Sequence, residues 1–128
     1  MMVKNEAHIV PQTIRAALQI SDDVVVCDTG STDDTIAVSK AAGARVVQEA
    51  WLGFGPTKNK ANTHALHNWI LQLDADEIPD LRLQQAILEL SLQNEKELFR
   101  MQFKSFLGDQ WIRFGEWGKD FHIRLFNR

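Results

Sequence analysis

Two aspartates in the middle of the chain, Asp74 and Asp76, are separated by one alanine and follow an apolar run at residues 69–73. If the backbone stays extended through them, residues i and i+2 project to the same side and the two carboxylates converge. Such a pair suits Mg²⁺ or Mn²⁺, which takes its remaining ligands from water and phosphate oxygens. The spacing therefore predicts a metal site for a phosphorylated ligand, most naturally a nucleoside diphosphate. In isolation, the same residues more often only close a turn and cap the next helix.

Three further polar clusters could contact a ligand. Asp28 follows an apolar run at residues 24–27 and begins a loop that can offer backbone N–H groups, hydroxyls and a carboxylate to a base or a ribose. Residues 3–6 follow the first apolar residues, and the basic pair Lys58 and Lys60 follows a loop with two glycines. Each cluster alone is more often a helix cap or solvated surface. Three of the four clusters, however, directly follow predicted strands.

The elements that must position these residues alternate along the first two thirds of the chain. Strands are predicted at residues 1–3, 24–27, 45–48 and 69–73, and helices at 9–18, 36–42 and 57–66. Such alternation requires right-handed crossovers and a mostly parallel, Rossmann-like sheet with helices on both faces, so the class is α/β. Ligands are expected beyond the carboxyl ends of the strands, where the polar clusters lie.

The last third changes its pattern. A leucine-rich helix is predicted at residues 80–93, after which Phe99, Met101 and Phe103 alternate with polar residues at strand spacing. Gly108 and its neighbour break this strand, residues 111–114 are expected to pair back against it, and a further alternating run lies at residues 121–125. We therefore expect antiparallel strands added to the parallel sheet.

Length and composition limit the possible functions. The chain has 128 residues, 45% of them hydrophobic, which is enough for one core and one domain, or most of one. A formal net charge of −3 gives no basic face for a nucleic acid. The single cysteine, Cys27, fits the reducing cytosol, and no apolar run approaches the roughly 20 residues that span a bilayer, so any membrane contact would be peripheral.

A series of four motifs points to one family. In chain order the motifs are V-K-N-E, V-V-V-C-D-T-G-S-T-D-D-T, W-L-G-F-G-P-T-K-N-K and W-I-L-Q-L-D-A-D-E. The series resembles family 2 glycosyltransferases, which have the GT-A fold, and the resemblance runs from Val3 to the C-terminus. Within the family the chain is most similar to the lipopolysaccharide core transferases of Gram-negative bacteria, because residues 106–113, Trp117 and residues 124–126 match their F-L-G-x-x-I-R, G-W and R-L-F segments.

The resemblance implies a binding site for a nucleotide-sugar donor, a UDP-, ADP- or GDP-sugar. Asn5, Glu6 and Asp28 would line the nucleotide pocket. Lys58 or Lys60 would lie near the base or the diphosphate. The sugar would be transferred to a glycan or glycolipid acceptor.

The resemblance also implies a metal-assisted reaction. Asp76 would be the main ligand of Mg²⁺ or Mn²⁺, and Asp74 would contact the ribose or the sugar. The reaction would be a single displacement at the anomeric carbon, with inversion of configuration and departure of a nucleoside diphosphate. In this family the general base is an aspartate or glutamate beyond the R-L-F segment, so we assign none here. Glu116 and Asp120 are poor substitutes.

Both ends of the sequence depart from the family pattern. Relatives carry several more apolar residues before V-K-N-E, and the segment with the general base lies beyond R-L-F. We therefore expect an incomplete single domain, cut short at both ends, in which residues 1–79 form the donor-binding half and residues 80–128 begin the acceptor-side half. The expected location is the cytoplasm, with the inner face of the cytoplasmic membrane as the site of any membrane contact.

Other interpretations stay open. The chain could be an inactive donor-binding fragment without the general base, and its open sheet edge could pair with a second copy in a homodimer. The sequence Asp28-Thr-Gly-Ser also resembles aspartic proteases, which need an almost wholly β chain, and D-x-D also occurs in phosphatases of the haloacid type. Trp51, Trp69 and Trp111 are expected to be packing residues, as is Trp117, although an acceptor-side role is open for it.

Overall fold

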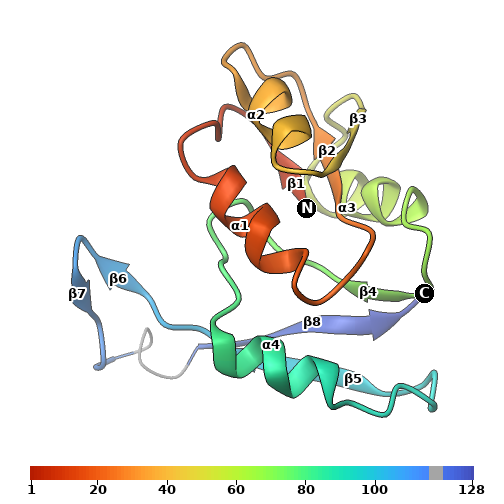
Figure 1. Ribbon diagram of the computed structural model, residues 1–128, viewed down its shortest axis with the longest axis vertical. Coiled ribbons are helices and arrows are strands. Elements are labelled where there is room, and N and C mark those ends of the chain that lie inside the picture. Colours follow the sequence, from red (N-terminus) through yellow and green to blue (C-terminus); the bar gives the residue numbers. More distant parts are fainter. Residues whose placement is uncertain (116–119) are drawn as a thin grey trace.

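The computed structural model describes residues 1–115 and 120–128. Four helices and eight strands are defined in the described residues (Figure 1). In chain order they are β1 Met2–Val3, α1 Val10–Ala17, β2 Val25–Asp28, α2 Thr35–Ala41, β3 Arg45–Gln48, α3 Phe54–Thr63, β4 Trp69–Leu71, α4 Leu81–Leu88, β5 Leu98–Gln102, β6 Phe106–Leu107, β7 Gln110–Trp111 and β8 Phe121–Asn127.

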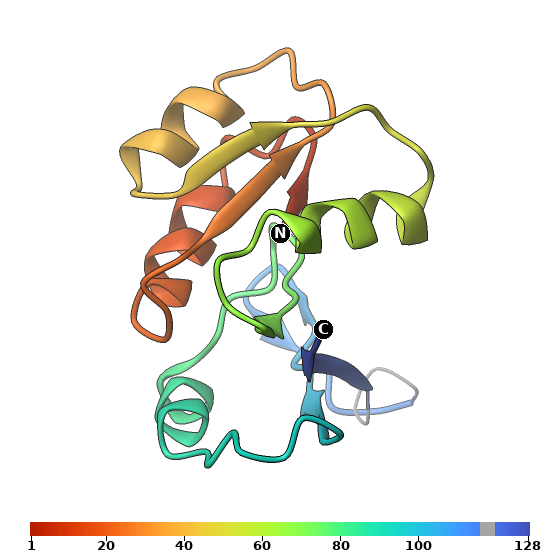
Figure 2. The same cartoon turned by 90° about the vertical axis from the view of Figure 1, so that its right-hand side faces the viewer.

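The first half forms a parallel sheet with the strand order β1-β2-β3. Val3 pairs with Asp28, and Asp28 pairs with Gln48, so the three strands end at the same edge. Helices α1 and α2 cover one face of this sheet and α3 covers the other (Figure 2). The predicted α/β class, with helices on both faces and strands at these places, is confirmed.

The second half adds an antiparallel sheet with the strand order β4-β8-β5. Ile70 pairs with Phe126, and a register shift in β5 follows Phe99. The prediction of antiparallel strands in the last third is confirmed. The prediction that residues 69–73 form a fourth parallel strand is largely wrong, because β4 pairs antiparallel with β8 and meets the parallel sheet through one bridge between Met2 and Asp74.

Two apolar clusters hold these sheets. Helix α1 buries Val10 and Ile14 completely against Val26 of the central strand, and each such side chain contributes roughly 1.5–3 kcal/mol when it leaves water. A second cluster around Met101 and Leu125 joins α4 to the antiparallel sheet. The core thus fixes β2, which carries Asp28, and β8, which carries Arg124.

Helix ends differ from the predictions by more than one residue at three places. Helix α3 begins at Phe54 instead of residue 57, because Gly53 adopts a φ of 95° before it and Pro56 is tolerated in a first turn. This helix ends at Thr63 instead of residue 66. Helix α4 ends at Leu88 instead of residue 93, while its start is fixed by the Asp80 carboxylate, which accepts a hydrogen bond from the third helical N–H.

Strands β6 and β7 form a separate hairpin that projects away from both sheets (Figure 1). Phe106 pairs with Trp111, and Leu107 pairs with Gln110. The prediction that residues 111–114 pair back against the 99–103 strand is wrong, since β5 pairs with β8 instead. No helix in the described part of the chain is long and apolar enough to cross a membrane.

Candidate functional site

The predicted polar clusters meet at the carboxyl edge of the parallel sheet. A cavity of about 380 Å³ opens there, and its lining includes Lys4, Glu6, Thr29, Asp74 and Asp76. These residues come from the loops after β1, β2 and β4. The structure therefore brings together three clusters that lie up to 72 residues apart in the sequence, the third through the bridge between Met2 and Asp74.

Asp28 lies at the end of β2 and is completely buried. Its Oδ1 accepts hydrogen bonds of 3.0 Å from the backbone N–H groups of Gly30 and Ser31, and Gly30 adopts a φ of 102° that permits this tight turn. Its Oδ2 is buried and has no hydrogen-bond partner among the described residues. A buried carboxylate oxygen without a donor is costly, so this atom is suited to a hydrogen-bond donor, but Asp28 itself lines neither cavity.

Asn5 joins two of the loops and is not part of the cavity lining. Its N–H donates to Ser31 Oγ at 2.9 Å, and its Oδ1 accepts from the N–H of Thr32 at 2.7 Å. These bonds hold Asn5 at a φ of 57°, a conformation that asparagine tolerates better than most residues. Glu6 lines the cavity, and its backbone N–H donates to Thr35 Oγ1 at 2.8 Å.

The two central aspartates occupy a turn and not an extended strand. The N–H of Glu77 donates to the carbonyl of Asp74 at 3.2 Å, which closes a turn at Ala75 and Asp76. The buried Thr13 of α1 donates from Oγ1 to the carbonyl of Ala75 at 2.5 Å. The expectation of an extended backbone through this motif is wrong, because these bonds bend it. Both aspartates still line the same cavity.

Asp74 is bound on both oxygens by cations. Lys58 Nζ lies 2.7 Å from its Oδ1, and Arg124 Nη2 lies 3.2 Å from its Oδ2. Lys58 of α3 thus reaches Asp74, but it lines a second, larger cavity and not the one of 380 Å³. Lys60 is exposed and lines neither cavity. Asp76 is exposed, and its carboxylate has no bonded partner in residues 1–115 and 120–128.

Arg124 and Glu77 are site residues that sequence reasoning missed. Glu77 Oε2 accepts from the N–H of Asp74 at 2.9 Å, and Glu77 Oε1 is ion-paired with Arg124 Nη2. The guanidinium of Arg124 also lies over the ring of Phe103, 5.2 Å from its centre. The R-L-F segment was recognised as a family match, but nothing in the spacing of one sequence shows that its arginine reaches a turn 50 residues earlier.

Trp51 is a further residue that sequence reasoning misjudged. It was expected to pack in the core, but it is 49% exposed and lines the cavity together with Phe54. Trp69 does pack, with its Nε1 donating to the carbonyl of Leu92 at 3.1 Å, whereas Trp111 is 41% exposed on the β6–β7 hairpin. Trp117 and Glu116 lie outside the described residues.

The residues of the cavity fit a metal ion only in a limited way. The described residues contain no group of three His, Cys, Asp or Glu side chains that could hold a metal ion. Asp74 already balances two cations, which leaves Asp76 and Glu6 as the other carboxylates of the cavity. Mg²⁺ is commonly bound through one or two carboxylates plus phosphate oxygens and water. The donor set therefore fits a metal that arrives with a diphosphate.

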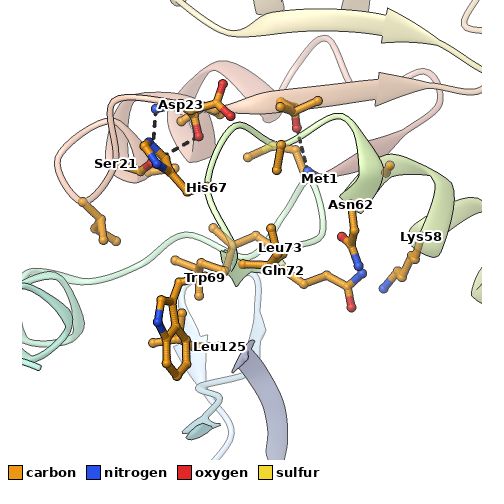
Figure 3. Close-up of a pocket in the computed structure, with 18 of the residues that line it drawn as sticks. Met1, Ser21, Asp23, Lys58, Asn62, His67, Trp69, Gln72, Leu73 and Leu125 are labelled. Atoms are coloured by element: carbon orange, nitrogen blue, oxygen red, sulfur yellow. Dashed lines mark hydrogen bonds between the residues drawn. The ribbon is translucent and has the colours of Figure 1, made fainter. Parts of the chain in front are cut away.

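A larger cavity of about 490 Å³ lies at the opposite end of the central strand, between α1, α3 and β4 (Figure 3). Its wall is mainly apolar and includes Trp69, Leu73 and Leu125. The Met1 ammonium group donates to the carbonyl of Val25 at 2.7 Å there, and burial lowers the pKa of this amine from 8.0 to about 6. Lys58 belongs to its lining, whereas Asp74, Asp76 and the other residues predicted to bind the donor do not.

Comparison with known proteins gives consistent results. The sequence model of glycosyl transferase family 2 matches residues 1–127. An uncharacterised glycosyltransferase of Rickettsia typhi is 34% identical over 133 residues, covering 100% of this chain and 45% of the relative. One of Rickettsia conorii is 39% identical over 87 residues, covering 68% and 31%. The crystal structure of glucosyl-3-phosphoglycerate synthase from M. tuberculosis superposes with a TM-score of 0.51 and 27% identity, over 61% of this chain and 33% of that protein.

The chain spans less than half the length of the curated relatives it matches. Within that span, the mixed α/β architecture resembles that of the solved synthase, and the polar motifs lie at the carboxyl ends of the strands. The family match covers every residue but the last. This chain therefore belongs to glycosyl transferase family 2.

Proposed function

We propose that this chain forms the donor-binding part of a metal-assisted, inverting glycosyltransferase that moves a sugar from a nucleoside-diphosphate donor to a glycan or glycolipid acceptor. One observation carries the proposal: Glu6, Thr29, Asp74 and Asp76, from three separate strand ends, line one cavity of about 380 Å³. Cavities of this size at the carboxyl ends of parallel strands are the usual ligand sites of α/β folds. The donor would be a UDP-, ADP- or GDP-sugar.

Each charged group has a defined part in this proposal. Asp28 does not line the cavity but directly precedes Thr29, which does, and its free oxygen would accept a hydrogen bond from the base or the ribose. Lys58 lines the larger cavity, but it is ion-paired with Asp74 of the proposed donor site and would turn its charge toward a diphosphate bound there. Asp76 would bind Mg²⁺ or Mn²⁺, and the metal would stabilise the negative charge that develops on the departing nucleoside diphosphate.

The acceptor side is proposed on the sequence match alone. Residues 106–113 and 124–126 resemble lipopolysaccharide core transferases, so we propose a cell-surface glycan as acceptor and a cytoplasmic location with peripheral contact to the inner face of the membrane. Residues 1–79 would then bind the donor, and residues 80–128 would begin the acceptor side. A general base is not assigned to this chain, and the alternative is a donor-binding fragment without turnover.

Calorimetric titration tests the proposal. UDP, GDP and ADP are each titrated, with and without Mn²⁺, into the wild-type chain and into Asp76→Ala. We expect one nucleotide to bind in a Mn²⁺-dependent manner, and Asp76→Ala to weaken that binding about tenfold or more, since a charged contact contributes roughly 1.5–3 kcal/mol.

Asp109→Ala is the matched control, because it removes an exposed carboxylate on the β6–β7 hairpin, outside the cavity. It should bind like the wild type. A folded wild-type chain that binds none of the three nucleotides, with or without Mn²⁺, would contradict the proposal. Equal losses in Asp76→Ala and Asp109→Ala would show that the effect is general charge and not a metal contact.

A further inference from the structure

Two exposed aromatic rings form one wall of the cavity. Trp51 and Phe54 lie in and after the loop that joins β3 to α3, and they are 49% and 73% exposed. Their ring centroids are 5.0 Å apart with an angle of 85° between the planes, an edge-to-face contact of the kind that aromatic pairs prefer. Both rings line the same cavity as Asp74 and Asp76.

The loop that presents these rings is held by specific bonds. Thr57 is completely buried, and its Oγ1 accepts a hydrogen bond of 3.0 Å from the N–H of Leu52, which lies between the two aromatic residues. The N–H of Thr57 in turn donates to the carbonyl of Gly53 at 3.0 Å, and Gly53 adopts a φ of 95° that other residues rarely reach. The rings are therefore held in position over the cavity and are not side chains on a loose loop.

Much of the remaining lining is polar. Glu6 and Thr29 supply hydrogen-bonding groups, and Lys4 and Asp74 add charge. A ligand that fits such a lining has a flat apolar face and a polar edge, and it carries charge. A nucleobase joined to a ribose and a diphosphate has these properties, and stacking of a base on an aromatic side chain contributes about 1–3 kcal/mol.

We propose that Trp51 is the stacking platform for the nucleobase of the donor, with the Phe54 ring set edge-to-face against it. The inference rests on the proposed function and adds the residues that hold the base. The base lies against the aromatic wall, its polar edge faces Glu6 and Thr29, and the diphosphate extends toward Lys58 and Asp76. Binding energy for the base and for the diphosphate therefore comes from different residues, which makes the two contributions separable.

The test compares a probe that has a base with one that lacks it. Dissociation constants of UDP, GDP, ADP and inorganic pyrophosphate are measured with Mn²⁺ for the wild type, Trp51→Ala and Trp51→Phe. For the nucleotide that binds best, Trp51→Ala should raise the dissociation constant about tenfold and leave that of pyrophosphate unchanged within about twofold. Trp51→Phe keeps a flat ring and should stay within about threefold of the wild type.

Trp111→Ala is the control, because Trp111 is an exposed tryptophan of the β6–β7 hairpin and does not line the cavity. It should leave every constant unchanged, and circular dichroism confirms that each variant is folded. If Trp51→Ala weakens the binding of that nucleotide and of pyrophosphate equally, or weakens neither, the platform is refuted while the donor site stands. If the folded wild type binds no nucleotide, the donor site itself is refuted.

Discussion

The buried amino group of Met1 gives the sharpest quantitative prediction. In a chain that begins at Met1, this amine is enclosed at the edge of the 490 Å³ cavity, and burial lowers its pKa from 8.0 to about 6. Each pKa unit corresponds to about 1.36 kcal/mol, so two units give about 2.7 kcal/mol. Because the folded amine holds its proton more weakly than the unfolded one, stability is highest above pH 8 and falls as the pH decreases through the interval from 8 to 6.

Acetylation of the amine removes this titration and keeps an N–H that can donate to the carbonyl of Val25. The acetylated and free chains contain the same other titrating groups, so the difference in their unfolding free energies isolates the amine. Urea unfolding of both forms should give a difference in favour of the acetylated chain that grows by about 2.7 kcal/mol between pH 9 and pH 5, with about half of the change present at pH 7. A difference that is constant across this range would refute the burial of the ammonium group.

The remaining predictions concern the site turn and α4. Thr13→Val should lower the free energy of unfolding by about 1–3 kcal/mol in urea titrations, because it leaves the buried carbonyl of Ala75 without a donor, while Thr13→Ser should retain most of the stability. Arg124→Met should weaken Mn²⁺-dependent nucleotide binding more than Arg124→Lys, since lysine keeps a positive charge beside Glu77. Equal losses in the two variants would refute the role of this charge in holding the turn. The pKa of Asp80 is lowered, first by an N–H of α4 and then by Lys104, so its contribution to stability is present above about pH 4 and lost in acid. Asp80→Asn should reduce the loss of unfolding free energy that the protein shows as the pH falls below about 4. An unchanged loss would contradict the lowered pKa of Asp80.

The fold was largely predictable because its signals are local. The unbroken apolar run before Asp28 indicates a strand buried on both faces, and the helical spacing of Val10 and Ile14 indicates a helix with one buried face. The structure has both elements. The parallel pairing of β1 with β2 then places the loops with Glu6 and Thr29 side by side. Asp74 joins the same cavity through its parallel bridge to Met2, a contact that the sequence does not show directly.

The parts that could not be predicted depend on contacts between distant residues. The bend at Ala75 is set by a hydroxyl on α1, and the free edge of β4 is paired by β8, more than 50 residues later. The exposure of Trp51 depends on a bond from the backbone beside it to the buried Thr57, whereas its residue type alone favours packing. In each case local preference was overruled by a tertiary hydrogen bond or strand pair.

The same contacts connect the two halves that were proposed to divide at residue 79. The turn that carries Asp76 is held by Thr13 from the first half and by Arg124 from the last strand, which acts through both Asp74 and Glu77. Arg124 is largely buried, and the Phe103 ring lies against it, so its guanidinium has little freedom to leave the turn. The proposed metal ligand, Asp76, is therefore positioned partly by the half that is proposed to bind the acceptor. A fragment that ends at residue 79 would keep every nucleotide motif and lose the group that fixes its geometry.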